Sequence, residues 1–404
     1  MTRLMQGFPP PPEGQVSLAN WRTAPFNRWA FHHVREIVPS ADIPNDPASV
    51  LDLPSSPVDL GTLRIDTDGR RALSLDEFAD ATDTDGLVIV QDGRVVFERY
   101  ASGMTAAAPH ILMSVSKSLL GLLAGILVAR GVLEPERLVT DVVPEVAATA
   151  YAGATIRHLL DMRAGVDFEE DYLAPAGPIV AYRKAASWNP LEPGDVPGDL
   201  RSFYAELTKS TGPHGGPLHY VSPNTDLLGW VIERATGQRY ADLMSELLWK
   251  PLGAAHSAYI TVDRLGAPRA AGGVCTTARD LARVGVLLAR AGARGSAQIV
   301  PERWIDDLAR GGDGRAWASG DLVPYFAGLP IRYRSQWYVK DGTVPLLFGL
   351  GIHGQNLFVD LTGGTVVAKV SSQAIPMDAG RIALTLRAAS AIVGFLAGRG
   401  QDFA

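Results

Sequence analysis

The sequence predicts an α+β fold in which an antiparallel sheet, flanked by helices, is interrupted by an inserted, mainly helical domain. Two short apolar strands flank a turn at Asp92-Gly93, which is a strong hairpin signal. Apolar spacing typical of helices then dominates from residue 114 to about 260. Strand patterns return at Phe348 to Val359 and at Thr365 to Ser371. Because the strands come from distant parts of the chain, we expect one sheet assembled around the inserted helices.

Length and composition describe an ordinary globular chain. Its 404 residues are 47% hydrophobic and 20% charged, which is enough for two packed units and a large core. The formal charge of −6 and the scattered arginines argue against nucleic acid or an anionic membrane as the main partner. The longest apolar run, Leu119 to Val128, is too short to span a bilayer. We expect no membrane partner, and a homodimer is compatible with this composition.

Two features predict a cytoplasmic location. Cys275 is the only cysteine, which excludes an internal disulfide framework and is consistent with a reducing compartment. The segment Met1 to Phe8, followed by four prolines, has no apolar stretch of signal-peptide length.

The predicted organisation has three parts. Residues 1–80 are rich in Pro, Asp and Ser and form an irregular arm that packs aromatic side chains on the body. Residues 81–113 and 265–404 form the α/β domain. Residues 114–264 form the mainly helical domain. The expected helices are 119–130, 156–162, 200–208, 225–235, 240–248, 278–291 and 379–396.

Two long loops, 163–198 and 209–222, separate the helices of the inserted part. Loops of that length inside a compact domain are usually functional. We therefore expect an active site at the seam between the two domains.

The tetrad Ser114-Val115-Ser116-Lys117, at the start of the apolar run, is the strongest chemical signal. Residues three apart on a helix share a face, so the Ser114 hydroxyl and the Lys117 amine come within hydrogen-bond range. A desolvated lysine can activate a serine nucleophile, and N–H groups at a helix N-terminus can stabilise an oxyanion. Alternatively, Ser114 only caps the helix and Lys117 is solvated. The apolar residues after Lys117 favour a buried helix and hence a nucleophile.

Tyr220 is the candidate for the third proton-handling group that acyl transfer requires. It ends the loop 209–219 and precedes a helix that begins near Thr225. A nearby ammonium would drive its phenol toward phenolate. The alternative is a tyrosine packed in the core with its hydroxyl satisfied.

The order of these motifs resembles the penicillin-recognising serine hydrolases: class C β-lactamases, DD-peptidases and family VIII carboxylesterases. It consists of Ser114-x-x-Lys117, then Tyr220-x-Ser222, then a Gly-rich strand near the C-terminus. The chain also resembles the 6-aminohexanoate-dimer hydrolases, amidases that degrade nylon oligomers, from residue 27 to about 372. The segments that carry this likeness are Asn27-Arg28-Trp29-Ala30-Phe31, Leu112-Met113-Ser114-Val115-Ser116-Lys117-Ser118, Glu170-Asp171-Tyr172, Asn224-Thr225-Asp226, Ala278-Arg279-Asp280-Leu281-Ala282-Arg283-Val284-Gly285 and Gly351-Ile352-His353-Gly354-Gln355-Asn356.

The resemblance implies a β-lactamase/DD-peptidase-like fold and a set of site residues. Ser114 would be the acylated nucleophile, Lys117 its proton partner and Tyr220 the acid or base for the leaving group. The backbone N–H groups of Ser114 and Ile352 would form the oxyanion hole. Tyr172, on the first long loop, would close over the substrate. Which of Lys117 and Tyr220 is the general base stays open.

Departures from the family pattern predict a changed specificity. Gly349-Leu350-Gly351 replaces the K-T-G of β-lactamases and Ser222 the Asn of their Y-x-N motif, so strong penicillin turnover is not expected. Arg183 stands near the position of an acidic residue that faces the substrate ammonium in efficient nylon-dimer hydrolases. The full set of expected substrate contacts is Tyr172, Arg183, Ser222, Ala271 in place of a His or Asn, Trp337, and Tyr338 in place of a Trp.

No metal and no cofactor are expected. Gly349 to Gly354 matches G-x-G-x-x-G, but it continues as a strand and opens no helix, which argues against a dinucleotide. His353, within that strand, is interpreted as a structural hydrogen-bonding residue. The histidines include no H-E-x-x-H and have no cysteine partners for a zinc site.

The sequence therefore predicts a serine hydrolase that cleaves small-molecule esters, and linear amides of the 6-aminohexanoate type, through an acyl-enzyme on Ser114. Two alternatives stay open. One is a carboxylesterase with negligible amidase activity, which Arg183 and Ala271 favour. The other is a catalytically silent binding protein on the same fold.

Overall fold

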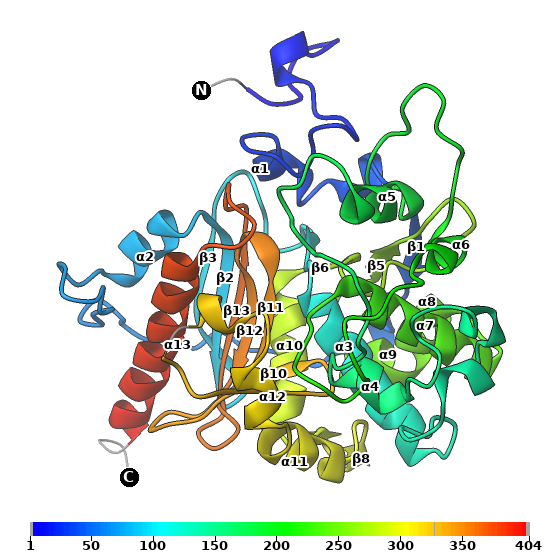
Figure 1. The fold of residues 1–404 in the computed structure, drawn as a ribbon. Coiled ribbons are helices and arrows are strands. Elements are labelled where there is room, and N and C mark those ends of the chain that lie inside the picture. The colour runs from blue at the N-terminus through cyan, green and yellow to red at the C-terminus, as the bar shows by residue number, and fades with distance from the viewer. Residues whose placement is uncertain (1–2, 327, 401–404) are drawn as a thin grey trace.

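A seven-stranded antiparallel sheet forms the centre of the computed structural model, which describes residues 3–326 and 328–400 (Figure 1). Its strand order is β3-β2-β13-β12-β11-β10-β9. Val88 of β2 pairs with Ala368 of β13, so both strand-rich ends of the chain contribute to one sheet. The strands are β2 Thr84–Gln91, β3 Arg94–Tyr100, β9 Ile331–Arg334, β10 Trp337–Lys340, β11 Leu346–Gly351, β12 Gln355–Val359 and β13 Thr365–Ser371.

The hairpin of β2 and β3 turns at Asp92-Gly93, as its sequence predicts. Asp92 has a φ of 51° and Gly93 a φ of 78°, and a two-residue type I′ turn requires positive φ at both positions. Alternate residues of β2 face opposite cores: Val88 belongs to one apolar cluster and Leu87 to the other. The sheet is therefore covered on both faces, which explains the nearly continuous apolar run of this strand.

Helices lie on both sides of the sheet. Helix α10 packs on β13, β12 and β2, while α13 lies across the opposite face (Figure 1). The helices outside the inserted part are α1 Asn27–Ala30, α2 Leu75–Ala81, α10 Ala278–Ala289, α11 Glu302–Arg310, α12 Gly314–Ala318 and α13 Ala379–Gly400.

The inserted part is mainly helical, and a second, smaller sheet lies beside it (Figure 1). Its helices are α3 Val115–Ala129, α4 Ile156–Leu160, α5 Pro178–Ala185, α6 Leu200–Phe203, α7 Ser222–Thr236, α8 Tyr240–Met244 and α9 Lys250–Leu252. The smaller sheet has the order β1-β5-β6-β4, with β1 Ser40–Ile43, β4 His110–Ile111, β5 Ala258–Thr261 and β6 Val274–Thr276; β7 Ala293–Arg294 and β8 Ala297–Gln298 form a separate hairpin.

Three segments differ from the expected elements. The arm is less irregular than predicted, because β1 pairs with β5 and α2 begins at a capping box formed by Ser74 and Glu77. The loop 163–198 contains helix α5, which starts at Pro178. His353 lies in the turn between β11 and β12 with a φ of 61°, and not within a strand. A single stretch from Phe348 to Val359 is thus two strands joined by a tight turn.

Helix α13 is long and apolar enough, by length and composition, to cross a membrane over Ala379–Gly398. In this fold it packs on the large sheet instead. Leu386, Ile392 and Leu396 are buried in the core that the helix shares with that sheet. Core helices of globular proteins pass the same compositional test, so packing explains the apolar face of α13.

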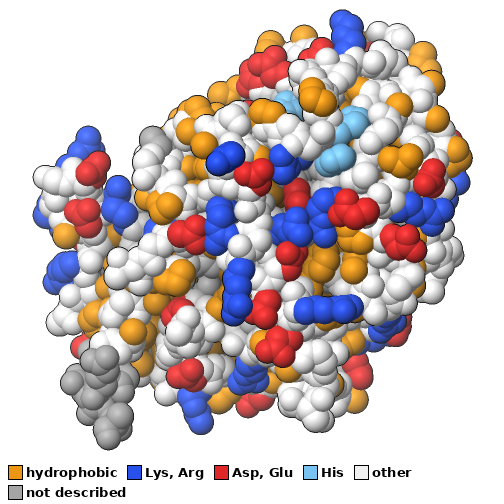
Figure 2. Space-filling model, turned by 60° about the horizontal axis from the view of Figure 1, so that its bottom comes forward, with side chains coloured by type: hydrophobic (Ala, Val, Ile, Leu, Met, Phe, Trp, Pro, Cys, Tyr) orange, Lys and Arg blue, Asp and Glu red, His pale blue; other side chains and the backbone are white. Residues whose placement is uncertain are grey.

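Charges of both signs are interspersed on the molecular face drawn in Figure 2. Several of the ion pairs are exposed, as between Arg71 and Glu77 at 2.8 Å. Exposed pairs of this kind contribute little to the free energy of folding.

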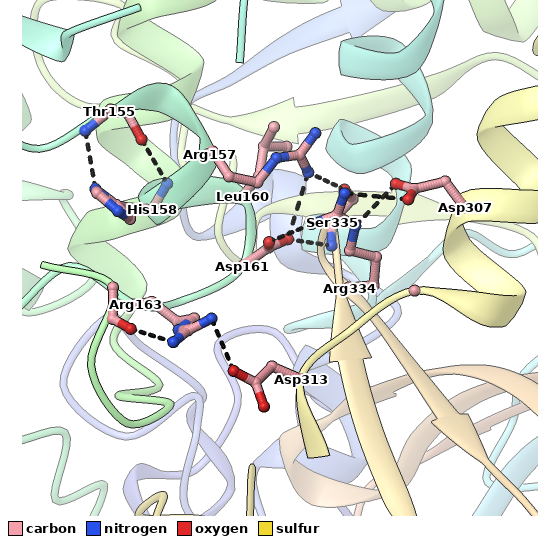
Figure 3. Close-up of polar contacts among 12 residues, drawn as sticks. Thr155, Arg157, His158, Leu160, Asp161, Arg163, Asp307, Asp313, Arg334 and Ser335 are labelled. Atoms are coloured by element: carbon pink, nitrogen blue, oxygen red, sulfur yellow. Dashed lines mark hydrogen bonds and ion pairs between the residues drawn. The ribbon is translucent and has the colours of Figure 1, made fainter. Parts of the chain in front are cut away.

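A polar network joins the helical part to the turn between β9 and β10 (Figure 3). The carboxylate of Asp161, just after α4, accepts hydrogen bonds from Arg334 Nη1 at 2.6 Å and from the Ser335 N–H at 2.9 Å. In the same turn, the Gln336 carbonyl accepts a hydrogen bond from Ser118 Oγ at 2.9 Å. The network therefore holds the large sheet against the buried side of α3.

Candidate active site

Helix α3 begins directly after Ser114, and the side chain of Ser114 makes no capping hydrogen bond. Met113, just before it, adopts the left-handed conformation with a φ of 45°. A buried methionine rarely adopts this conformation, and such strain tends to occur at functional sites. The bend turns the chain from β4 into α3 and leaves the Ser114 hydroxyl at the first turn, 8% exposed. Simple helix capping therefore does not explain Ser114.

Lys117 is buried one turn into α3 and is 1% exposed. Its Nζ contacts three oxygens: Ser114 Oγ at 2.8 Å, the Ala271 carbonyl at 2.9 Å and Ser222 Oγ at 3.1 Å. Ser222 lies at the start of α7, and Ala271 lies just before β6. Three segments that are distant in sequence thus converge on one amine, and the solvated alternative for Lys117 is wrong.

The pKa of Lys117 is lowered to about 8, mainly by burial. Glu170 and Asp226 oppose this change, because their negative charges favour the ammonium, while the positive charge of Arg269 reinforces it. A lysine with this pKa is neutral in a substantial fraction of molecules near pH 8. The neutral amine has a lone pair that can accept the Ser114 proton.

A buried ion pair positions the Ala271 carbonyl. Asp226, on α7, forms an ion pair with Arg269 and accepts a hydrogen bond from the Tyr182 hydroxyl. The other oxygen of Asp226 accepts the Ala271 N–H at 2.7 Å. Asp226 and Arg269 are each 5% exposed, so each is the principal counter-charge of the other. The pair holds the backbone whose carbonyl contacts Lys117.

Tyr220 lies beside Ser114 and Lys117. Lys117 Nζ is 4.9 Å from the centroid of the Tyr220 ring. Asp321 orients the loop, because its carboxylate accepts the Tyr220 N–H at 3.0 Å and His219 Nδ1 at 2.9 Å. Tyr220 is 7% exposed, and its phenol hydrogen-bonds with Ser114, so a proton donor lies beside the candidate nucleophile.

The ionisation of Tyr220 differs from the expectation. Burial raises the pKa of Tyr220 above its ordinary value, and hydrogen bonds with Ser114 and Tyr338 only partly oppose this rise. The predicted drift toward phenolate is therefore wrong for the site as it stands. A neutral phenol suits an acid better than a base, while the lowered pKa of Lys117 suits a base.

Close backbone approach brings the Ser114 and Ile352 amides to the same pocket. A Cβ on Gly351 would lie 2.6 Å from the Leu112 carbonyl and 2.9 Å from the Ser114 nitrogen, so only glycine fits where β11 crosses the start of α3. Within the described chain, neither the Ser114 nor the Ile352 N–H donates to a protein acceptor. Two free donors beside the Ser114 hydroxyl are the arrangement that an oxyanion hole requires.

Two cavities meet at this site. A small pocket of about 30 Å³ is lined by Ser114, Ile352, Arg183 and Ala271, among others. A larger cleft of about 630 Å³ is lined by Tyr220, by the segment 167–173 and by residues around 321 and 375–377. Glu170 and Tyr172 line both cavities and form the wall between them.

The other predicted substrate contacts divide into two groups. Tyr172, Arg183, Ser222 and Ala271 line the small pocket. Trp337 and Tyr338 are at most 2% exposed and lie outside the residues that line either cavity. Trp337 donates its indole N–H to the Ser118 carbonyl at 2.9 Å and supports α3 from behind. These two residues therefore act, at most, through the groups that they support.

Several residues at the site had no role in the sequence interpretation. Arg22 comes from the arm and lines the small pocket. Glu170 accepts hydrogen bonds from the backbone N–H and the hydroxyl of Ser222. Arg269 pairs with Asp226. No local motif links these pairs, because they are 43 or more positions apart and meet only in the folded chain.

His353 has the structural role that was predicted, although in a turn. Its Nδ1 hydrogen-bonds the Gln373 carbonyl at 2.6 Å, and burial lowers its pKa to about 4. Across residues 3–326 and 328–400, no three His, Cys, Asp or Glu side chains gather in a way that could hold a metal ion.

A buried Ser-Lys pair with a tyrosine beside it, on an antiparallel sheet flanked by helices, defines a class of enzyme. Comparison with known proteins identifies that class. Residues 75–391 match the model of the beta-lactamase family. The chain belongs to this family and is a serine hydrolase.

A particular group of relatives stands out within the family. The chain is 36% identical to the 6-aminohexanoate-dimer hydrolase of Paenarthrobacter ureafaciens over 366 aligned residues. The aligned region covers 90% of each chain. A solved structure from Bacillus anthracis, whose name assigns it to the 6-aminohexanoate-dimer hydrolases, superposes with a TM-score of 0.87 at 26% identity. It covers 96% of this chain and 99% of its own. Esterase EstB of Burkholderia gladioli is 31% identical over 156 residues, 38% of each chain. The predicted β-lactamase-like α+β fold is confirmed.

Proposed function

We propose that this chain hydrolyses small carboxylic esters through an acyl-enzyme on Ser114. The observation that carries the proposal is the 2.8 Å contact between Ser114 Oγ and Lys117 Nζ, beside the free N–H groups of Ser114 and Ile352. Together these groups supply a nucleophile, its base and an oxyanion hole.

Acylation starts with neutral Lys117. Lys117 Nζ takes the proton of the Ser114 hydroxyl while Ser114 Oγ forms a bond to the substrate carbonyl carbon. The electron pair of the C=O bond moves to the carbonyl oxygen, and the two N–H groups stabilise this oxyanion. The ammonium of Lys117 then keeps its contacts with the Ala271 carbonyl and Ser222 Oγ.

The tetrahedral intermediate then expels the leaving group. Tyr220 gives its proton to the leaving oxygen as the bond between that oxygen and the carbonyl carbon breaks, and the Lys117 ammonium returns a proton to the phenolate. The products are the acyl-enzyme and an alcohol. Water repeats the sequence in reverse: it loses a proton to the same groups, attacks the acyl carbon and releases a carboxylic acid and free Ser114.

Linear amides are the second candidate substrate class. The curated relative with 36% identity is named for the dimer of 6-aminohexanoate, a linear amide. Its acyl half ends in an ammonium, and Arg183 lines the acyl side of the pocket in this chain. Because two cations repel each other, this dimer should be a poor substrate, which favours a carboxylesterase with little amidase activity.

The test pairs a short-chain 4-nitrophenyl ester with the linear 6-aminohexanoate dimer, using wild type and Ser114→Ala. We expect a stoichiometric burst of nitrophenolate from the wild type and an acyl adduct on the peptide that contains Ser114. Ser296→Ala, at an exposed serine between β7 and β8, is the matched control and should keep the burst. Absence of both serine-dependent ester hydrolysis and an acyl adduct on Ser114 would refute the acyl-enzyme proposal.

A further inference from the structure

Three arginines line the small pocket beside Ser114. Arg22 comes from the N-terminal arm, Arg183 from helix α5 and Arg269 from the segment before β6. Arg269 has its own counter-charge in Asp226. Arg22 makes cation–π contacts with Trp21 and Trp188: its guanidinium carbon lies 5.6 Å and 5.9 Å from their ring centroids.

Among the described residues, Arg22 and Arg183 form no ion pair at contact distance, although the charges of Glu170 and Asp171 attract Arg183. Arg22 Nη2 donates to the Asn189 side-chain oxygen, and Arg183 Nη2 donates to the Tyr172 carbonyl at 3.0 Å. The Nε groups of Arg22 and Arg269 are buried and make no hydrogen bond. A buried cation without a counter-charge is costly, and a buried N–H group without an acceptor adds to that cost.

Glu170 is the acidic residue that lines the same pocket, and it is already engaged. Its carboxylate accepts two hydrogen bonds from Ser222, and its charge favours the protonated forms of both Lys117 and Arg183. Burial, together with repulsion from Arg183 and Arg269, lowers the pKa of Arg22 to about 9. Arg22 is still mostly protonated at neutral pH, so Arg22 and Arg183 outnumber the single carboxylate of Glu170 and the pocket keeps a net positive charge.

The position of Tyr220 tells which part of a substrate enters this pocket. The leaving group must face the Tyr220 hydroxyl, and Tyr220 lines the larger cleft. The acyl group then extends to the other side of Ser114, into the pocket with the arginines. Several carboxylates, including Asp171 and Asp321, line the larger cleft, so an anion is favoured on the acyl side alone.

We propose that the preferred substrates carry a carboxylate on the acyl group, which Arg22 and Arg183 bind in the small pocket. This inference rests on the proposed hydrolase function and specifies its substrate class. The pocket volume of about 30 Å³ suits a small polar group at the end of a slender chain. The charge preference is the reverse of that required for an acyl group that ends in an ammonium.

Three 4-nitrophenyl esters of equal chain length test the proposal: the monoester of adipate, the ester of hexanoate and the ester of 6-aminohexanoate. They differ only in a terminal carboxylate, methyl or ammonium group. We expect kcat/KM to fall in that order, with adipate favoured over hexanoate by about tenfold or more. Arg22→Gln and Arg183→Gln should each reduce the adipate-to-hexanoate ratio, and Arg183→Lys should retain most of it. Arg310→Gln, at an exposed arginine of α11, is the matched control and should leave the ratio unchanged.

The outcomes separate this inference from the hydrolase function. Serine-dependent hydrolysis of the hexanoate ester without preference for adipate would refute the carboxylate site and leave the enzyme proposal intact. If no ester is hydrolysed, calorimetric titration of Ser114→Ala with adipate still tests the site. Binding that Arg22→Gln weakens about tenfold supports it, and equal affinity for adipate and hexanamide overturns it.

Discussion

The carbonyl oxygen of Ala271 accepts a 2.9 Å hydrogen bond from Lys117 Nζ, while the N–H of the same residue donates to Asp226. One residue thus links the candidate base to the buried Asp226–Arg269 ion pair. A backbone carbonyl is present whichever residue stands at position 271, so this contact depends on the groups that position the backbone. The following predictions test the candidate site and its support.

Hydrolysis should depend on the neutral form of Lys117. Because its pKa is lowered to about 8, kcat/KM for a neutral ester should rise about tenfold per pH unit from pH 6 and level off above pH 8. In Lys117→Arg, the guanidinium keeps its proton throughout this pH range, so the variant should lose both the activity and the rise of kcat/KM with pH. Glu170→Gln removes a negative charge that favours the ammonium form of Lys117. This variant should therefore have the midpoint of its kcat/KM profile at lower pH. A flat profile between pH 6 and 9 would exclude Lys117 as the base.

Tyr220→Phe should distinguish leaving groups. An alkoxide or an amine needs a proton as it leaves, whereas 4-nitrophenolate does not. We expect the variant to lose about a hundredfold or more in kcat on an ethyl ester and less than about tenfold on the 4-nitrophenyl ester. Equal losses on both substrates, measured with titrated active sites, would show that Tyr220 acts in the attack of Ser114 instead.

Gly351→Ala should damage the oxyanion hole. The new Cβ would lie within 3 Å of the Leu112 carbonyl and the Ser114 nitrogen, so β11 must move away from α3. We expect kcat to fall by about a hundredfold with a smaller change in KM. Gly394→Ala, at an open and exposed position of α13, is the matched control and should stabilise the fold slightly without affecting kcat. Wild-type kcat in Gly351→Ala would contradict the role of these amides.

Asp226→Asn should destabilise the fold. The substitution leaves the buried Arg269 without its counter-charge, and breaking such a pair typically costs about 3–5 kcal/mol. Urea unfolding followed by circular dichroism measures the loss in the free energy of unfolding. Asp242→Asn, at an exposed position of α8, is the control and should stay within about 0.5 kcal/mol of wild type. A loss below about 1 kcal/mol would show that the pair contributes little to stability.

Local sequence signals predicted much of the scaffold and the centre of the site. The hairpin at Asp92-Gly93, the strand Thr365 to Ser371 and the helix after Ser114 lie where apolar period and turn chemistry put them. Such signals are local, because a turn residue or a period of apolar residues acts over only a few positions. The spacing of Ser114 and Lys117 belongs to the same category.

Long-range contacts were harder to predict. The arm was expected to be irregular, yet β1 completes a sheet and Arg22 reaches the pocket, because both depend on partners more than a hundred residues away. The expected phenolate character of Tyr220 was wrong because burial outweighs a nearby ammonium. Trp337 was expected at the substrate, but it supports α3 from behind.

The sequence by itself determined the Ser114–Lys117 pair on one helix face, because that pair depends on residue types at short spacing. The fold class and the family were indicated by the resemblance of motifs spread along the chain. The tertiary structure alone decided which charges meet at the pocket: Arg22 and Arg183 lie beside the single carboxylate of Glu170, and Arg269 pairs with Asp226. It also decided how far burial changes the pKa of Lys117 and of Tyr220. Desolvation and Coulomb interactions depend on distance and on exclusion of water, and both arise only when distant segments pack together.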